Sequence, residues 1–216
     1  MKAKPALPER VRSMEGLGLM PTRKYLYLTN SEWVRTWVRG GRIPILPAST
    51  YLSSERSGTF TPDENLIHEA PVDVTKLAGI QIGAEINIKS LSVRNTEWRG
   101  IQNPDFENAS YYREDGLVLS FASRNRQSIA DRLGKVACVK ILDMEALKRT
   151  IDRQLDISST MKSCEYTTDH RRNHFLKSFE DEWQCEYRMF WRLQKRVEVV
   201  LPAGLAKRVA ILPDAA

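Results

Sequence analysis

The sequence predicts an α+β domain built around a mostly antiparallel sheet. Short stretches in which apolar and polar residues alternate, as is typical of β-strands, recur along the whole chain. Helical patterns stand between some of these stretches, but they do not alternate strictly with them as they would in a parallel βαβ fold. No repeat, low-complexity tract or Gly/Ser-rich linker divides the sequence, so we expect a single domain.

The composition is that of a folded protein without a membrane span. Hydrophobic residues make up 42% of the 216 residues and charged residues 28%, and the apolar runs are all short. We expect residues 1–20 to form a flexible N-terminal arm without a secretory signal, and residues 21–216 to form the single domain. Three widely spaced cysteines favour a reducing, cytoplasmic setting over a disulfide framework.

The first part of the domain has the order strand, helix, strand. Residues 24–28 alternate aromatic and aliphatic side chains, which predicts a strand. Tryptophan and valine then recur at helical spacing until Gly40-Gly41, which ends the helix. A second strand is predicted over residues 42–46, and Pro44 indicates an edge strand or an early position in the strand, because proline cannot donate to a ladder.

The remaining elements follow from the same patterns. Residues 80–93 alternate almost strictly and predict one long strand or a hairpin, whereas residues 98–115 resemble a loop. Asp143 stands where it can cap the helix that follows it. In order, we expect a strand over 117–121, a helix over 127–133, a strand over 136–142, a helix over 144–155, a strand over 164–167, a helix over 169–179, and strands over 186–193, 197–201 and 209–212.

Residues 48–69 form a long polar segment that also contains several apolar side chains. Serine, threonine, glycine and proline cannot fill a core, yet Tyr51 and Phe60 are unfavourable in water. We expect this segment to fold over a cleft beneath Glu186, with Tyr51 or Phe60 facing a ligand and Arg56 holding an anionic group, and to be mobile until ligand binds. The alternative is a surface loop whose apolar residues seal the edge of the sheet.

The stretch DEWQCEYRMFW (181–191) begins with acids and ends as an apolar strand. Glu186 stands at the start of this strand, where a carboxylate can project into a cleft while the strand behind it stays packed. The alternative is that Glu186 serves only structure, by pairing with Arg188 or with another cation across the sheet.

From Leu117 onward the chain resembles a large uncharacterised bacterial domain family with a C-terminal Trp-x-x-Glu-x-Arg strand. The family landmarks match Leu119-Ser120-Phe121-Ala122, Val136-Ala137-Cys138-Val139, Cys164-Glu165-Tyr166, the Lys-x₅-Trp-x-x-Glu-x-Arg run from Lys177 to Arg188, and Leu201-Pro202. The family's usual Asn-Asp-Pro is missing from the N-terminal half, where Thr61-Pro62-Asp63-Glu64 is the nearest equivalent.

The opening strand–helix–strand order and the position of Glu186 also resemble nucleic-acid-targeting ADP-ribosyltransferase toxins. The resemblance implies a split central sheet with peripheral helices, NAD as cosubstrate, and Glu186 as the catalytic residue that binds the nicotinamide ribose and stabilises its oxocarbenium-like transition state. It implies a toxin or phage-defence effector that modifies a nucleic acid or protein and is held by an antitoxin or inhibitory partner. The implied NAD-binding residues are Tyr27, Thr29, Ser49, Tyr51, Arg56 and Arg188.

A binding function without catalysis is the main alternative. The net charge of +6 and the pI near 9.3 favour polyanionic partners, or serve solubility alone. Aromatic residues interleaved with arginine can stack bases and neutralise phosphates. The residues that motivate this alternative are Trp98, Tyr111 and Tyr112 beside Arg94, Arg99 and Arg113.

Two metal-dependent interpretations of the sequence are weaker. Pro62-Asp63, Glu85 and Lys89 resemble the core of metal-dependent nucleases, but Asn87 replaces the expected acid. His170 and His174, with Cys164 and Cys185, are zinc-capable residues at a spacing that matches no standard zinc finger. We therefore expect no metal site.

Overall fold

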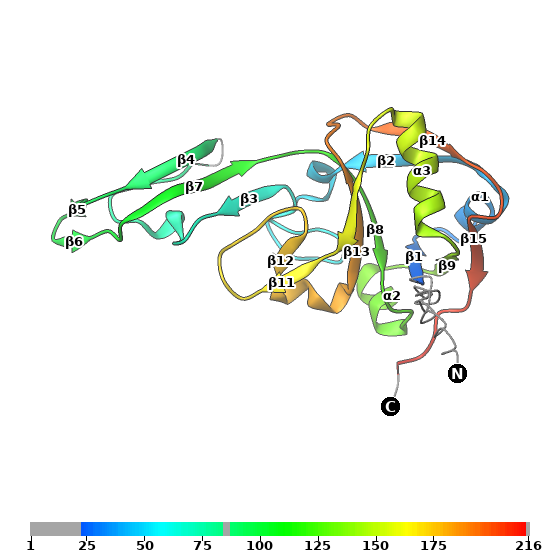
Figure 1. The fold of residues 1–216 in the computed structure, drawn as a ribbon. Coiled ribbons are helices and arrows are strands. Elements are labelled where there is room, and N and C mark those ends of the chain that lie inside the picture. The colour runs from blue at the N-terminus through cyan, green and yellow to red at the C-terminus, as the bar shows by residue number, and fades with distance from the viewer. Residues whose placement is uncertain (1–22, 84–86, 215–216) are drawn as a thin grey trace, which may run out of the picture.

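The computed structural model describes residues 23–83 and 87–214. Over these residues the chain forms one α+β domain whose strands are almost all antiparallel, with few helices (Figure 1). The arm predicted over residues 1–20 lies outside the described residues. None of the helices in the described ranges is long and apolar enough to cross a membrane.

The main sheet has eight strands, which come from both the N-terminal and the C-terminal half of the sequence. Six of the strands fall on or close to predicted ones, β10 was not predicted, and β15 overlaps the strand predicted over 209–212 only at Val209. Its members are β1 (Lys24–Leu28), β2 (Gly41–Pro47), β8 (Leu117–Ala122), β9 (Ala137–Ile141), β10 (Thr160–Ser163), β13 (Glu186–Trp191), β14 (Val197–Leu201) and β15 (Ala206–Val209). Six of them lie in the order β10-β13-β8-β1-β9-β15, while β2 branches from β8 and pairs with β14 on its other side.

The sheet splits at β8. Leu117 and Val118, at the start of β8, pair with the end of β2. Ala122, at the other end, pairs with Tyr25 of β1. Strand β13 follows β8 along its full length, with Glu186 opposite Ala122. Glu186, the first residue of β13, therefore lies across β8 from the position where β8 pairs with β1.

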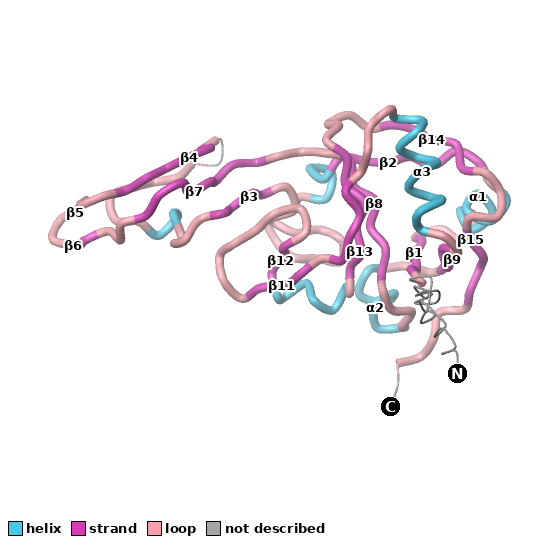
Figure 2. The backbone as a smooth tube through the Cα atoms, viewed as in Figure 1, coloured by secondary structure: helices cyan, strands magenta, loops and turns pink. Residues whose placement is uncertain are grey.

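Helices cover both faces of the main sheet (Figure 2). Helices α1 (Trp33–Arg39) and α3 (Met144–Leu155) pack on the face that carries Leu26 and Leu28. Helix α2 (Gln127–Leu133) packs on the opposite face, against Tyr27. All three helices begin or end within a residue or two of the predicted positions, and Asp143 caps α3 by accepting from the Ala146 amide at 2.8 Å.

A second, three-stranded sheet extends from the main body as an arm (Figure 1). It consists of β3 (Leu66–Glu69), β7 (Phe106–Arg113) and β4 (Ile88–Val93), and the small hairpin β5 (Glu97–Trp98) and β6 (Ile101–Gln102) lies at its end. The prediction of a loop over 98–115 was wrong, because β7 has a bulged register and no clean alternation. The long strand predicted over 80–93 is limited to β4 among the described residues.

The segment before β13 also differs from the prediction. No helix forms over residues 169–179. Instead β11 (Glu165–Thr167) pairs in parallel with β12 (Leu176–Ser178), and a 3₁₀ helix, η3 (Phe179–Gln184), follows. Asn173 and Asp169 explain the difference, because their side chains accept from backbone amides two residues further on and so stabilise turns.

Gly116 fits a site that no larger residue can occupy. A Cβ atom at this position would lie 2.4 Å from the Phe190 ring and 2.5 Å from the Trp191 carbonyl oxygen. We expect Gly116→Ala to lower the free energy of unfolding by about 1–3 kcal/mol, as measured by denaturant unfolding. Gly83→Ala is the control, since its Cβ would meet nothing within 4 Å. Equal stability of the two variants would contradict this packing.

Candidate functional site

The two acids that open DEWQCEYRMFW, Asp181 and Glu182, belong to η3, whereas Glu186 belongs to the strand. Glu180, Asp181 and Glu182 lie in its first turn, where negative charge is favoured by the exposed backbone amides. Cys185 ends the helix with a left-handed φ of 45°, and its amide donates to the Glu182 carbonyl. This turn directs the chain into β13 and places Glu186 as its first, buried residue.

Four buried charged side chains meet at the start of β13, and we call them the charge quartet. Arg188 Nε donates to Glu186 Oε1 at 2.7 Å, and its Nη2 lies 2.6 Å from Glu64 Oε1. Lys177 Nζ lies 2.9 Å from Glu186 Oε2 and 3.7 Å from Glu64 Oε2. None of the four side chains is more than 7% exposed. Two carboxylates thus face two cations, and the quartet is neutral as a whole.

Neutral groups add further hydrogen bonds to the quartet. Thr61 Oγ1 donates to Glu64 at 3.2 Å, and Lys177 also donates to the side-chain oxygen of Gln184 at 2.9 Å. Arg188 Nη1 donates to a backbone carbonyl at 3.0 Å. Buried charges are costly unless paired and hydrogen-bonded, so these ion pairs and hydrogen bonds are what allow the quartet to exist in the interior.

Glu186 is ionised under ordinary conditions. Burial alone would raise the pKa of its carboxyl group, but Arg188 and Lys177 hold that pKa well below its usual range. Burial likewise opposes the charge of Lys177, whose pKa the two glutamates raise above its usual value. A carboxylate that stays ionised cannot donate a proton, so Glu186 can act only by charge and by accepting hydrogen bonds.

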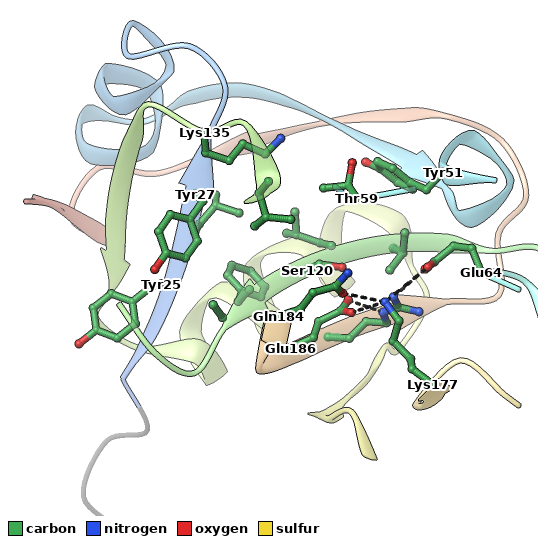
Figure 3. Close-up of a pocket in the computed structure, with 17 residues that line it drawn as sticks. Tyr25, Tyr27, Tyr51, Thr59, Glu64, Ser120, Lys135, Lys177, Gln184 and Glu186 are labelled. Atoms are coloured by element: carbon green, nitrogen blue, oxygen red, sulfur yellow. Dashed lines mark hydrogen bonds and ion pairs between the residues drawn. The ribbon is translucent and has the colours of Figure 1, made fainter. Parts of the chain in front are cut away.

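The quartet forms part of the wall of a pocket of about 180 Å³ that lies over the split in the sheet (Figure 3). Strand β8 supplies Ser120, β1 supplies Tyr27, and the segment after β2 supplies Tyr51 and Thr59. Lys135 lies at the same pocket. A pocket of this size admits a single ring system and not a complete dinucleotide, so a larger ligand would extend out of it.

Glu186 has room for about one more hydrogen bond. Its two oxygens accept from Arg188 and Lys177, and the Ser120 hydroxyl is a further neighbour that lowers the pKa of the carboxyl group, after the two cations. An ionised carboxylate offers about four acceptor positions, so about one remains for a ligand group in the pocket. A hydroxyl group on the ligand is the simplest donor for this position.

The structure brings four of the seven residues predicted for the site to this pocket. Glu186, Arg188, Tyr27 and Tyr51 all line it. Tyr51 lies near the quartet, and burial followed by the charge of Glu64 raises the pKa of its hydroxyl. Tyr27 lies at the other end of the pocket, with its hydroxyl pointing away from Glu186 (Figure 3). That hydroxyl is held by backbone groups of the loop before α2, so only the ring of Tyr27 can contact a ligand.

The other three predicted residues do not line the pocket. Thr29 accepts a hydrogen bond from Lys135 at 2.8 Å. Ser49 is tied to Asp115 through its amide and its hydroxyl, at 2.9 and 2.5 Å. Arg56 pairs with three acids, Asp63, Glu180 and Asp181. Each side chain is therefore engaged within the protein, and Lys135 is the cation that the pocket offers in place of Arg56.

Segment 48–69 contacts the site as predicted, but through a different set of residues. Tyr51, Thr59 and Glu64 line the pocket, whereas Phe60 does not and is 43% exposed. The sequence reasoning missed Glu64 and Lys177 as members of the site. Lys177 is the first residue of a matched family landmark, so the sequence carried a signal for it, whereas Glu64 lies in the segment where the family landmark is missing.

The metal-binding interpretations find no support in the described residues. Within 23–83 and 87–214, no three His, Cys, Asp or Glu side chains are grouped to hold a metal ion. Asp63 pairs with Arg56 and Arg172, and Lys89 lies over a tyrosine ring of the arm. Glu85 lies outside the described residues.

Two of the three arginines that motivated the binding alternative are engaged in contacts within the protein. Arg94 pairs with a neighbouring glutamate, and Arg113 donates to an asparagine at 2.7 Å. Tyr111 and Tyr112 are only partly exposed. Trp98 and Arg99 remain exposed at the end of the arm, where the arginine lies over the indole. The arm therefore offers one aromatic–cation pair and not a continuous binding face.

Two buried histidines predict a marked acid sensitivity. His68 and His174 are 3% and 6% exposed, and burial lowers the pKa of each to about 4. The unfolded histidines bind protons near pH 6.5, so the unfolded state gains protons first as the pH falls. We expect the free energy of unfolding to fall between pH 6.5 and 4, by up to about 1.4 kcal/mol per pH unit for each histidine.

The contribution of one histidine can be isolated by substitution. His68 Nε2 has no hydrogen-bond partner, so His68→Phe should be tolerated and should reduce the slope of unfolding free energy against pH. Ile67→Val is the control, because Ile67 is buried in the same strand and carries no titratable group. An unfolding free energy that stays constant from pH 6.5 to 4 would contradict the burial of both rings.

Searches against protein-family models, curated proteins and solved structures find no match for the chain. The geometry of the pocket and the sequence landmarks around it are therefore the basis for assigning a function.

Proposed function

We propose that this protein is an ADP-ribosyltransferase-like enzyme that cleaves NAD and transfers ADP-ribose to a macromolecule. The observation that carries the proposal is the position of Glu186, an ionised carboxylate that is fixed by two cations and retains about one free acceptor position toward a ring-sized pocket. The opening strand–helix–strand order, which resembles that of nucleic-acid-targeting ADP-ribosyltransferase toxins, supports the same assignment.

Cleavage of the bond between nicotinamide and ribose leaves positive charge on the ribose ring. A fixed carboxylate beside that ring stabilises the charge without any reorganisation during the reaction. Arg188 and Lys177 offset part of the negative charge of Glu186, but they also hold its carboxylate in one orientation and keep it ionised. We assign to Glu186 the ribose hydroxyl and the developing oxocarbenium ion.

The remaining pocket residues fit the other parts of the dinucleotide. The nicotinamide ring, which is of the size that the pocket admits, would lie against Tyr51. Lys135 offers a positive charge to the diphosphate, although burial lowers its pKa. The acceptor would then attack the ribose carbon from which nicotinamide has left, and lose its proton. An enzyme of this kind is toxic to the cell that contains it, so an inhibitory partner is expected.

The test is incubation of the purified protein with NAD labelled in the adenylate part, together with mixed protein, RNA and DNA. We expect release of free nicotinamide and transfer of the label to one class of macromolecule. The proposal is refuted by the combination of intact NAD and no label transfer. It is also refuted when Glu186→Gln, verified as folded by circular dichroism, is as active as the unmodified protein.

A further inference from the structure

One row of side chains crosses the main sheet and ends at Glu186. Residues directly opposite one another on adjacent strands project from the same face of a sheet. Following the pairing from β13 to β15, Glu186 is opposite Ala122, Ala122 opposite Tyr25, Tyr25 opposite Lys140, and Lys140 opposite Lys207. With strands about 4.8 Å apart, the backbone at Lys140 is about 14 Å from that at Glu186.

The far end of this row places two like charges face to face. Lys140 and Lys207 are directly opposite, and like charges in that position destabilise a sheet. After burial, the positive charges of Arg23 and Lys207 are what lower the pKa of Lys140. Among the described residues, none of these three cations forms an ion pair with an acid. A polyanion that binds here would neutralise these positive charges and so remove the repulsion between them.

A second group of cations lies on the same face, around α2. Arg124, Arg126 and Arg132 line a pocket of about 510 Å³, and none of them pairs with an acid in the described part of the chain. Trp183 and the 53% exposed Phe179 line the same pocket. The Arg132 guanidinium lies over the Trp183 ring at 3.8 Å, so planar groups already stack here. We call this the arginine pocket.

The arginine pocket is the immediate neighbour of the Glu186 pocket. Along η3 and β13, Gln184 and Glu186 line the Glu186 pocket, while Trp183 and Cys185 line the arginine pocket. Two acids, Glu180 and Glu182, also line the arginine pocket, but Glu180 is paired with Arg56. Asp214 lies close enough to Arg126 for this arginine to lower its pKa, after the hydrogen bonds from Ser128. The three arginines still outnumber the two acids Glu182 and Asp214, which leaves an excess of positive charge beside the proposed active site.

We propose that Lys140, Lys207 and the arginine pocket form a track that binds single-stranded nucleic acid and leads it to Glu186. The cations would contact successive phosphates, and a base would stack on the exposed aromatic and guanidinium planes of the arginine pocket. A single strand fits better than a duplex, because a pocket of this size can take a base only when it is unpaired. That this strand is the acceptor of ADP-ribose rests on the proposed function, but its binding does not.

The test measures binding without NAD, so that it is independent of catalysis. The anisotropy of fluorescently labelled single-stranded RNA and DNA is followed at several salt concentrations. We expect Lys140→Ala/Lys207→Ala and Arg124→Ala/Arg126→Ala each to weaken binding at least about tenfold. Each should also reduce the slope of log affinity against log salt by about 0.7 for every phosphate that the variant no longer neutralises. Arg94→Ala/Arg99→Ala, on the arm, is the matched control and should change binding little.

Stability provides a second, independent readout. Because Lys140→Ala removes a repulsive pair, its Tm should equal or exceed that of the unmodified protein while its binding weakens. The proposal is overturned by binding that is absent or independent of salt, or by equal losses in the arm control. It is also overturned by a preference for duplex, or by full displacement of the strand by ADP-ribose, which would assign the arginine pocket to the dinucleotide.

Discussion

Glu186→Gln is expected to reduce the rate of nicotinamide release from NAD by about 100- to 1,000-fold. The substitution keeps the shape of the side chain but removes the negative charge that faces the pocket, and a fixed charge at a developing cation typically contributes an effect of this size. The measurement is kcat and KM for NAD, with the folded fraction of each variant determined first. We expect the loss to appear in kcat more than in KM, because the interaction strengthens in the transition state.

The matched control for this prediction is Glu64→Gln. It removes the same charge from the same buried quartet, where Glu64 shares Lys177 and Arg188 with Glu186. Both substitutions should lower stability. Glu64→Gln should nevertheless retain activity within about tenfold of the unmodified protein, because the proposed contact with the ribose is made by Glu186 and not by Glu64. Equal losses of kcat in the two variants would show that the quartet serves structure and that Glu186 has no separate chemical role.

Arg188→Met should be the most destabilising of the substitutions considered. Arg188 is 2% exposed and contacts both carboxylates of the quartet, so its removal leaves two buried negative charges with only Lys177. Breaking a buried ion pair from one side costs about 3–5 kcal/mol, compared with a total stability of about 5–15 kcal/mol for a typical domain. The measurement is the free energy of unfolding in urea at neutral pH.

A double-mutant cycle shows whether this loss comes from unpaired charge. In Arg188→Met/Glu64→Leu, one cation and one anion leave together, so the double variant should be more stable than the sum of the single losses predicts, by about 0.5–3 kcal/mol. The exposed pair Arg42–Glu198, 3.9 Å apart, is the control and should be additive within about 0.5 kcal/mol. Additive losses at both pairs would mean that Arg188 matters only for packing.

The parts of the fold that could be predicted from sequence are those where local pattern and tertiary packing agree. Strands β1, β8, β9 and β13 are rich in aliphatic and aromatic residues, and α3 has both an apolar stripe and a capping aspartate. The arm could not be predicted in the same way. Strand β7 has irregular pairing with β4 and an asparagine, Asn108, with a positive φ of 57°, so its sequence shows no regular period.

Only the part of the site that lies within one short segment could be predicted from the sequence. Glu186 and Arg188 lie two residues apart on one strand, so their common face follows from strand geometry. Glu64 lies far from Glu186 in the sequence, and only the folding of segment 48–69 over the split sheet brings the two together. Arg56 is the opposite case: the sequence showed a lone cation, but not the three acids that surround it in the structure.

A crystal structure of Glu186→Gln with NAD would decide whether residue 186 faces the ribose, because this variant should bind NAD without cleaving it. We expect the nicotinamide ring in the pocket of about 180 Å³ against Tyr51, with a ribose hydroxyl within hydrogen-bond distance of residue 186. NAD bound elsewhere on the protein, or a pocket that stays empty at saturating NAD, would contradict the proposed function.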